Sequence, residues 1–492
     1  MSATLRALAP GLASGLLLAA SFPPAPPSPA PFLVLVPLAL GLERLPAGAA
    51  GRGPAARLGA VAGTVGWALL LPWTWAALAA TPVWGTLAFA ALVGAFAALT
   101  AGVLVAAHAL RSARVPAALA LPLAWVAGEW LRGHLGPFAF PWLPLANGLT
   151  GLPALLGLAP WVGASGVGLW LALPQGAWAG WLSAPGASRS ALAGRAVGTA
   201  AWLASGVLAW PAPAPAGPTL DVLIVQPDLP VRGDPRATAE RALARAGRAV
   251  EGRRADLVVL PEGALPVDVP RSPTVVAALA GLAEQSGGAV VVGALGQGVP
   301  GMPGARTNRV HLVRADGLDP VEYDKRRLVP ILERTPFLPA GGDLTAGRSP
   351  GVLEVAGVRA GVLVCYESIF PELARDLARG GAGFLLNPTN DAWYRARGAG
   401  TSGLLQHPAH LVFRAIETGR PAVRVANTGP SFLVDARGRL AAVTPLRTDT
   451  LLALRVPTVT GPATPFTRTG DLVGPFAAGA VLLLWAAARR RG

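Results

Sequence analysis

The chain has 492 residues, of which 52% are hydrophobic and 14% are charged. These proportions exclude a disordered chain and are unusual for a soluble one, so they predict that part of the molecule lies in a membrane. The formal net charge of +15 could suggest nucleic-acid binding, but the basic residues follow predicted membrane boundaries and do not gather beside stacking aromatic residues, so we expect no nucleic-acid partner.

Apolar segments of roughly the length needed to cross a bilayer, about 20 residues, dominate the chain before Pro218, and one more lies near the C-terminus. The sequence therefore predicts about eight transmembrane helices, of which the second is short. They cover residues 6–22, 29–42, 58–78, 84–109, 115–131, 159–183, 191–210 and 472–488. Residues 1–22 could alternatively be a cleaved signal peptide, but the further spans make cleavage unnecessary.

The arginines of the short loops indicate the orientation of these spans. In the eight-span arrangement those before Pro218, except Arg132, fall on one side of the membrane together with the C-terminal arginines, and the positive-inside rule makes this the cytoplasmic side. Both chain ends are then cytoplasmic, and the long segment between the seventh and eighth spans is extracytoplasmic. The arginines on the cytoplasmic side are Arg6, Arg44, Arg52, Arg57, Arg111, Arg114, Arg189, Arg195, Arg489, Arg490 and Arg491.

A proline-rich stretch, PAPAPAGP at residues 211–218, predicts a stiff linker and a domain boundary. We expect a membrane domain over 1–217, a catalytic domain over 218–465, and a last transmembrane helix with a basic tail over 466–492. In the middle domain, short β-rich runs alternate with helical patterns such as 237–253, which indicates an α/β fold. The predicted strands cover residues 220–225, 256–260, 289–292, 361–364 and 383–386.

Glu262 is the first candidate for chemistry in this α/β region. It stands in DLVVLPEGALP, directly after a buried strand pattern and Pro261, so its carboxylate should emerge where a strand ends. A glutamate in that place could act as a general base. The alternative is an ordinary solvated loop acid.

Lys325, in VEYDKRRLVP, is the only lysine among 41 basic residues. An exposed lysine could have been replaced by arginine, as it is at every other basic position. Its retention indicates a place where a compact ammonium works and a planar guanidinium does not.

Cys365, in GVLVCYES, is the only cysteine, so the chain can form neither an intramolecular disulfide nor a thiolate metal cluster. A lone cysteine is often a buried, inert apolar residue. Here an apolar strand pattern runs straight into a helical one, which predicts a tight turn with an exposed thiol beside free backbone N–H groups. Such a nucleophile elbow favours the thiolate and offers donors to an oxyanion.

Two further polar pairs leave their alternatives open. His407 and His410, in QHPAH, are of a metal-ligating type, but Pro408 separates them and no third ligand is evident. We therefore expect no metal and no cofactor. Glu129 and Arg132, near the outer end of the fifth span, could form a structural ion pair or contact a lipid headgroup.

The ordered set LPEGALP, YDKRRLVP and VCYESIFPE resembles the Glu-Lys-Cys triad segments of the nitrilase, or carbon–nitrogen hydrolase, superfamily. Four other segments are similar to those of the apolipoprotein N-acyltransferases. They are AWVAGEWLRG, FPWLPL, NPTNDAWY and RVANTGPS. The resemblance implies a multi-span membrane enzyme of the bacterial cytoplasmic membrane with an extracytoplasmic α-β-β-α nitrilase-like domain.

The same resemblance implies a reaction and roles for three residues. Membrane phospholipid is the acyl donor, and the N-terminal amine of a diacylglyceryl-modified apolipoprotein is the acceptor. Glu262 is the general base, Cys365 the nucleophile that carries the acyl chain as a thioester, and Lys325 the stabiliser of the oxyanion.

Three more residues match the family and are supporting candidates: Glu333, Tyr366 and Glu367. Glu333 could instead pair with Arg326 or Arg327, and Glu367 could be a plain acid in the first turn of a helix. One departure concerns VQPDLP, at residues 225–230, because many family members place a tryptophan soon after it and this chain does not.

Two other functions compete with acyl transfer. A membrane-tethered amidase or nitrilase acting on small amides would use the same three residues but would need only one anchoring span. An envelope scaffold or transporter with a decayed nitrilase-like domain would not need to keep both the sole lysine and the sole cysteine.

Overall fold

The structure is a computed structural model, and it describes residues 3–78, 82–183, 189–231, 233–299, 302–335, 342–396 and 401–489. The chain divides into two compact units. The first comprises residues 1–211, 396–406 and 469–492, and the second comprises residues 212–395 and 407–468. Arg232, Arg490 and Arg491 lie outside the described residues.

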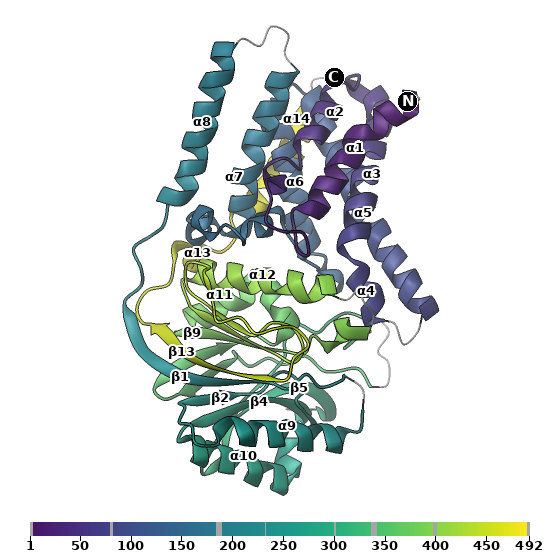
Figure 1. Cartoon of the computed structure of the whole chain (residues 1–492). Helices are drawn as coiled ribbons and strands as arrows, with labels where there is room; N and C mark the ends of the chain where they lie inside the picture. Colours follow the sequence, from purple (N-terminus) through teal and green to yellow (C-terminus); the bar gives the residue numbers. More distant parts are fainter. Residues whose placement is uncertain are drawn as a thin grey trace. The chain divides into compact units, whose positions relative to one another are not determined.

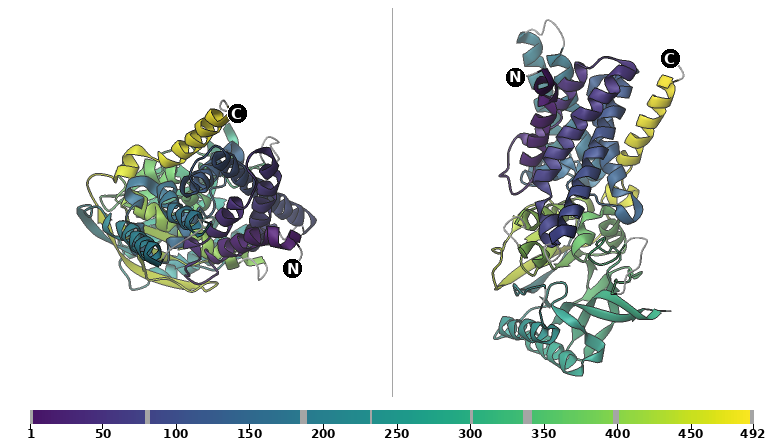
Figure 2. Two further views of the ribbon diagram at one scale, coloured as in Figure 1. Left: turned by 90° about the horizontal axis from the view of Figure 1, so that it is seen from above. Right: turned by 90° about the vertical axis from the view of Figure 1, so that its right-hand side faces the viewer.

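The first unit is built from helices, and its longest ones run side by side (Figures 1 and 2). Helix α3 packs against α1 and α5, and α6 packs against α7 and α14. The helices are α1 (Ala3–Ala20), α2 (Val36–Glu43), α3 (Arg52–Leu70), α4 (Pro72–Ala77), α5 (Pro82–Ser112), α6 (Ala117–Gly133), α7 (Ala159–Leu182), α8 (Arg189–Leu208) and α14 (Val473–Arg489).

Glycines allow α3 and α5 to approach closely. A Cβ atom added at Gly59 would lie 2.6 Å from the Thr100 carbonyl oxygen, and one at Gly63 would lie 2.7 Å from the Ala97 Cα. Helices in membranes associate through such small-residue contacts, because lipid provides no hydrophobic drive to bring them together. The packing of α3 on α5 is therefore of the kind expected inside a bilayer.

Two of the helices are long and apolar enough to cross a membrane by length and composition: α5, over Pro82–Ser112, and α8, over Ala191–Leu208. Shorter apolar helices cover Arg6–Ala20, Ala30–Glu43 and Val473–Ala487. A helix lies at each predicted span, but three of the predicted spans are not single regular helices. The span 58–78 is divided at Leu71 into α3 and α4, and Gly163 has a non-helical conformation inside the span 159–183. The third is 29–42. A 3₁₀ turn, Ala30–Phe32, precedes α2, and the eight residues of α2 rise only about 12 Å.

Gln175 of α7 compensates for the break before α2. Its Oε1 accepts a hydrogen bond from Leu35 N at 2.8 Å, and its Nε2 donates to Pro31 O at 3.1 Å. Irregular backbone in an apolar setting persists only where its polar groups find internal partners. Here the buried side chain of Gln175, from the neighbouring helix α7, supplies these partners.

The second unit contains two β-sheets. Within the described residues one sheet has the order β13-β1-β2-β4-β5-β6, with β3 paired to β4, and the other has the order β12-β11-β10-β9-β8-β7. The strands of the first are β1 (Ala216–Gln226), β2 (Leu257–Val259), β3 (Leu265–Asp268), β4 (Ala289–Val299), β5 (Met302–Arg314), β6 (Gly317–Asp324) and β13 (Thr450–Val459). Those of the second are β7 (Val352–Val355), β8 (Val358–Val362), β9 (Phe384–Thr389), β10 (Ala422–Ala426), β11 (Phe432–Val434) and β12 (Leu440–Ala441).

The two sheets pack face to face and carry helices on their outer sides (Figure 1). Alternate residues of both sheets, such as Ile224 and Val362, share one buried apolar cluster. The opposite face of the first sheet forms a second cluster with α9 (Pro235–Val250) and α10 (Pro273–Ser286). The second sheet is covered by α11 (Pro371–Arg379) and by α12 (Thr401–Thr418) from His407 onward, and the short α13 (Pro465–Thr469) follows β13. The predicted α-β-β-α architecture is therefore confirmed.

Local sequence explains the elements that were predicted. Asp234 caps α9 by accepting hydrogen bonds from Arg236 N and Ala237 N, and Pro235 occupies the first helical position. The five predicted strands correspond to β1, β2, β4, β8 and β9. β1 begins at Ala216, inside the proline-rich stretch, because its first residues already pair with β13.

Candidate active site

The three triad candidates all lie where strands of the second unit end. Glu262 follows β2, Lys325 follows β6, and Cys365 follows β8. Although β2 and β6 belong to one sheet and β8 to the other, the two sheets pack face to face. Side chains from three distant parts of the sequence can therefore meet at one end of the sandwich.

Lys325 is the centre of this cluster. It is 1% exposed, and its Nζ donates to Glu262 Oε1 at 2.8 Å and to Glu333 Oε1 at 3.0 Å. Burial alone lowers the pKa of Lys325, but the negative charges of Glu262 and Glu333 outweigh it and raise the pKa well above its usual value. The site therefore holds a charged ammonium at neutral pH.

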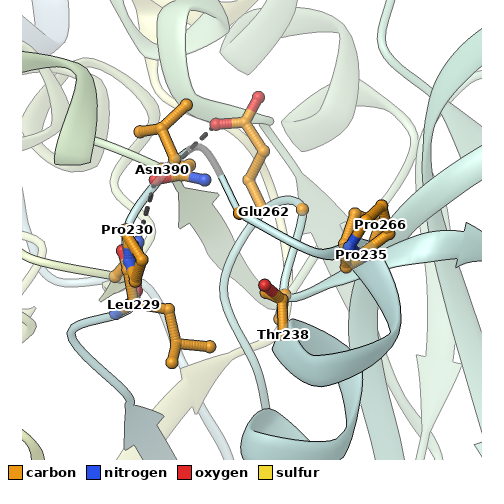
Figure 3. Close-up of a pocket in the computed structure, with 12 residues that line it drawn as sticks. Leu229, Pro230, Pro235, Thr238, Glu262, Pro266 and Asn390 are labelled. Carbon is orange, nitrogen blue, oxygen red and sulfur yellow. Dashed lines mark hydrogen bonds between the residues drawn. The ribbon is translucent and has the colours of Figure 1, made fainter.

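Two asparagines complete the environment of Glu262. Asn308 Nδ2 donates to Glu262 Oε1 at 2.6 Å and to Glu333 Oε1 at 3.0 Å, so it bridges the two carboxylates. Asn390 N donates to Glu262 Oε2 at 2.7 Å, and Figure 3 shows the carboxylate directed toward Asn390. Both carboxylate oxygens are thus held, and the direction of the Glu262 side chain is fixed.

Cys365 occupies a strained turn. Its φ is +50°, a value that residues other than glycine adopt rarely, and it opens a 3₁₀ helix, Cys365–Ile369. Strain of this kind gathers at functional sites, where the surrounding structure enforces it. The sharp turn that the strand-to-helix pattern predicts at this cysteine is present, although the regular helix begins only at Pro371.

The predicted exposure and acidity of the thiol are wrong. Cys365 is 7% exposed. Burial raises the pKa of the Cys365 thiol, the Glu262 charge adds to this, and the Lys325 ammonium opposes it. A five-residue 3₁₀ helix also offers much less of a positive end than the α-helix assumed in the prediction. The resting thiol is therefore neutral, and it needs a base during the reaction.

The raised pKa of Cys365 predicts an unusual pH profile for alkylation by iodoacetamide. Because only the thiolate reacts, the rate should climb about tenfold per pH unit and continue to climb above pH 9, whereas the rate for free cysteine levels off near its pKa of about 8.5. Mass spectrometry can follow the label without ambiguity, because the chain has one cysteine. A plateau at or below the value for free cysteine would contradict the buried neutral thiol.

Glu367 ties the Lys325 and Cys365 segments together. Its carboxylate accepts hydrogen bonds from Arg326 N at 2.7 Å and Arg327 N at 3.1 Å, just after Lys325, and from Val364 N at 2.7 Å, just before Cys365. Burial raises the pKa of Glu367, while these N–H donors oppose the shift. Glu367 does lie in the first turn of a helix, the 3₁₀ helix Cys365–Ile369, and there it is completely buried and joins the two segments.

The other supporting candidates also lie at this cluster. Glu333 contacts Lys325, not the neighbouring arginines, and its second oxygen accepts from Val329 N at 2.7 Å. Tyr366 is buried, and its ring packs edge-on against Phe370 with centroids 5.1 Å apart. Burial raises the pKa of Tyr366, against the lowering effect of Lys325 and Arg327, so its hydroxyl stays neutral.

Several polar residues near Cys365 were not given roles from sequence: Asn308, Asn387, Asn390, Asp391 and Arg424. All but Asn308 stand in the segments NPTNDAWY and RVANTGPS, which carried the resemblance but no chemical argument. His407 lies beside Ser368 and the Cys365 carbonyl and belongs to this group. Among the described residues, no group of three or more His, Cys, Asp and Glu side chains could hold a metal ion.

A cavity of about 280 Å³ lies beside Glu262 (Figure 3). Its wall includes Leu229, Pro230, Val231 and Gly233, the loop in which the family tryptophan is missing from this chain. Asn427 holds the loop by accepting from Leu229 N at 2.9 Å and donating to Leu229 O at 2.7 Å. The departure from the family pattern therefore lies at the edge of the candidate site.

In the first unit, Glu129 and Arg132 interact electrostatically, and each also has further partners. Glu129 Oε1 accepts from Trp125 Nε1 at 2.9 Å and from Leu145 N at 2.8 Å. The Arg132 guanidinium lies over two neighbouring rings, 4.8 Å from the centroid of Trp67 and 5.1 Å from that of Phe96. Aromatic faces stabilise this buried cation, although its Nε and Nη2 have no hydrogen-bond partner among the described residues.

Two family models and many known proteins match this chain. Residues 14–177 match the family model of the apolipoprotein N-acyltransferase N-terminal domain, and residues 222–462 match that of carbon-nitrogen hydrolase. An apolipoprotein N-acyltransferase of Geobacter metallireducens is 30% identical over 472 residues, which are 89% of this chain and 87% of that protein. One of Rhizobium meliloti is 34% identical over 382 residues, 70% of this chain and 69% of that one.

Among solved structures, a mutant amidase of the nitrilase superfamily from Nesterenkonia has a TM-score of 0.39 at 23% identity, and the match covers 52% of this chain and 95% of that one. The two family models together span both units, and the relatives align across both. The chain belongs to the apolipoprotein N-acyltransferase family.

Proposed function

We propose that this chain transfers a fatty acyl group from a phospholipid to the N-terminal amine of diacylglyceryl-cysteine in bacterial lipoproteins. One observation carries the proposal. The sole lysine, Lys325, is buried and contacts both Glu262 and Glu333. Glu367 connects the segment of Lys325 to the turn that holds the sole cysteine, Cys365. The relatives that span both units carry the name apolipoprotein N-acyltransferase.

The first half-reaction acylates Cys365. Because the thiol is neutral at rest, its proton must pass to a base as sulfur attacks, and Glu262 is the carboxylate whose charge most affects the thiol. The sulfur attacks the carbonyl carbon of the phospholipid ester. The bond to the glycerol oxygen then breaks, and that oxygen takes the proton from Glu262. The products are a lysophospholipid and a thioester on Cys365.

Negative charge on the carbonyl oxygen is stabilised between these steps. The Lys325 ammonium has three N–H donors, of which two point to Glu262 and Glu333. The third can donate to the oxyanion, together with the backbone N–H of Tyr366. Donors fixed in a buried site stabilise a developing charge without having to reorganise.

The second half-reaction resolves the thioester. The lipoprotein α-amine attacks the thioester carbonyl, Glu262 accepts the proton that the nitrogen loses, and the carbon–sulfur bond breaks. The leaving sulfur recovers the proton from Glu262, which restores the resting enzyme and leaves an amide on the lipoprotein. The same base and the same oxyanion donors therefore serve both halves.

The helical first unit suits two substrates that reside in a bilayer. We propose the eight-span topology, with a membrane domain over 1–217, an extracytoplasmic catalytic domain over 218–465, and a membrane helix with a cytoplasmic tail over 466–492. The two helices of spanning length and the arginines of the loops support it. In this topology the enzyme is a multi-pass protein of the bacterial cytoplasmic membrane.

An amidase acting on small soluble amides is the competing function, because the same residues could hydrolyse an amide. A single anchoring helix would serve that activity, whereas this chain has a helical unit that matches a family model from residue 14 to residue 177. The extent of the helical unit favours lipid substrates.

Incubation of membranes containing this protein with phospholipid labelled in its acyl chains tests the proposal. We expect a labelled adduct on Cys365 that hydroxylamine removes, as it removes thioesters, and that disappears when a diacylglyceryl peptide with a free amine is added. A parallel incubation with small amides measures ammonia release. Ammonia release without any acyl adduct would establish the amidase instead.

A further inference from the structure

The carbonyl oxygen of Cys365 receives three buried hydrogen bonds. Ser368 Oγ lies 3.0 Å from it, His407 Nε2 lies 3.1 Å from it, and Asn387 Nδ2 lies 3.4 Å from it. Ser368 and Asn387 are completely buried, and His407 is nearly so. A peptide carbonyl oxygen has two lone pairs and so needs at most two hydrogen-bond donors. The carbonyl oxygen of Cys365 has three donors nearby, which is more than it needs.

Arg424 orients two of these donors. Its side chain is completely buried, with Nη1 donating to Asn387 Oδ1 at 2.8 Å and Nη2 lying 3.3 Å from His407 Nδ1. Asp391 Oδ2, 3.3 Å from Nη2, neutralises the buried guanidinium. A single charged group thus contacts the acceptor atoms of both side chains, whose donor ends face Cys365.

The contact with Arg424 settles the tautomer of His407. A guanidinium only donates, so His407 Nδ1 must accept and its ring proton must be on Nε2, the nitrogen that faces both Cys365 O at 3.1 Å and Ser368 Oγ at 3.0 Å. Burial, and then the Arg424 charge, lower the pKa of His407 well below its usual value, which keeps the ring neutral. The same logic places the Asn387 oxygen toward Arg424 and its NH₂ toward two carbonyl oxygens, that of Leu363 at 2.6 Å and that of Cys365 at 3.4 Å.

Fixing the Cys365 carbonyl also fixes the N–H of Tyr366. The two groups belong to one trans peptide, which is planar, so they point in opposite directions. We propose that Arg424, acting through His407 and Asn387, holds the Cys365–Tyr366 peptide in the orientation that presents the Tyr366 N–H to the oxyanion formed at Cys365. These three are positioning residues, and the inference rests on the proposed role of Cys365 as nucleophile.

The chain of hydrogen bonds also polarises that peptide. Positive charge on Arg424 strengthens donation by His407 Nε2–H and Asn387 Nδ2–H, and donation to the carbonyl in turn makes the peptide N–H a better donor. The φ of +50° at Cys365 is energetically unfavourable, so relaxation of the turn to a common backbone conformation would lower the energy. Without the donors at its carbonyl, the peptide can rotate and turn its N–H away.

Two reactions of the sole cysteine separate this role from a general one in folding. Acylation by the p-nitrophenyl ester of a fatty acid forms an oxyanion, whereas alkylation by iodoacetamide forms none. In the full chain in lipid nanodiscs, His407→Leu should slow ester acylation about 10²-fold, as loss of an oxyanion donor does, while alkylation stays within about threefold of the wild-type rate.

Rescue by a conservative variant identifies the atom involved. His407→Gln keeps an N–H donor near the position of Nε2, so it should recover most of the ester reaction. Ser368→Ala removes the hydroxyl donor from the same carbonyl. It should slow the ester reaction less than His407→Leu does, and it should likewise spare the alkylation. His108→Leu is the matched control, because it removes another buried imidazole, from α5 of the first unit, and should leave both reactions unchanged.

Three results would overturn the proposal: a wild-type ester rate in His407→Leu, an equal loss of both reactions, or no recovery in His407→Gln. A wild-type protein that the ester does not acylate on Cys365 would overturn it as well. If the ester acylates Cys365 but phospholipid never does, the proposed function fails and the positioning role stands.

Discussion

Cys365→Ala should abolish acyl transfer, with no labelled thioester on the chain and no N-acylated product. No other residue can take over, since the chain has no second thiol. The substitution removes one sulfur atom. It leaves the backbone strain unchanged, because alanine and cysteine both have a Cβ atom and pay the same energetic cost at a φ of +50°. The thermal unfolding temperature should therefore stay close to that of the wild type.

The measurement is the transfer of labelled acyl chains from phospholipid to a diacylglyceryl peptide, with the adduct located by mass spectrometry. Cys365→Ser is the matched variant, because it keeps an oxygen in place of the sulfur but offers an unactivated hydroxyl of much higher pKa. We expect it to be inactive too. Transfer by the alanine variant would show that the amine attacks the phospholipid ester directly, without a covalent intermediate.

The residues of the candidate site could be found from the sequence because two kinds of signal coincided. Glu262 and Cys365 each follow an apolar run of strand type, and such runs end at one edge of a sheet. Lys325 was found by amino-acid usage, since a lysine kept among arginines reports a local need for its shape. The strands β3, β5, β6, β7 and β10–β13 were missed. In β5 and β6, charged residues such as Arg309 and Glu322 stand at positions where buried strands are apolar.

The environment of Cys365 could not be predicted in the same way. The burial of the Cys365 thiol depends on tertiary packing. Burial raises the pKa of the thiol, whereas the N-terminal end of a helix would lower it. The positions of Arg424 and His407 beside Cys365 could not be predicted from the sequence either. A fully buried arginine sits in a strand of otherwise apolar residues, and its partners Asn387 and Asp391 come from a segment 33 residues or more away.

The membrane part shows a similar limit. Hydropathy located a helix at every predicted span, but it could not show that residues 29–42 break into a turn and a short helix. The break depends on Gln175, which lies 140 residues from Leu35 and satisfies the backbone there. Composition reports that a segment is apolar, whereas continuity of the helix depends on partners elsewhere in the chain.

Lys325→Arg should lower the rate of acyl transfer by about 10²–10³-fold, although the charge is kept. The lysine is 1% exposed, and its Nζ already lies 2.8 Å from Glu262 and 3.0 Å from Glu333, so a larger planar group would have to displace these carboxylates. A guanidinium would pair with the two carboxylates through its fork and shift its remaining donors away from the oxyanion. The rate constant for Cys365 acylation, measured in a single turnover with labelled phospholipid, should fall more than the affinity for phospholipid.

The opposite exchange at an exposed site is the control for the arginine variant. Arg236→Lys changes the same two residue types on α9, where the side chain is 89% exposed, and should leave the rate unchanged. Normal acylation by Lys325→Arg would show that charge alone is needed at this place and that the retention of lysine has no chemical cause. A loss of acylation with unchanged iodoacetamide alkylation would instead locate the defect in stabilisation of the oxyanion, because alkylation passes through none.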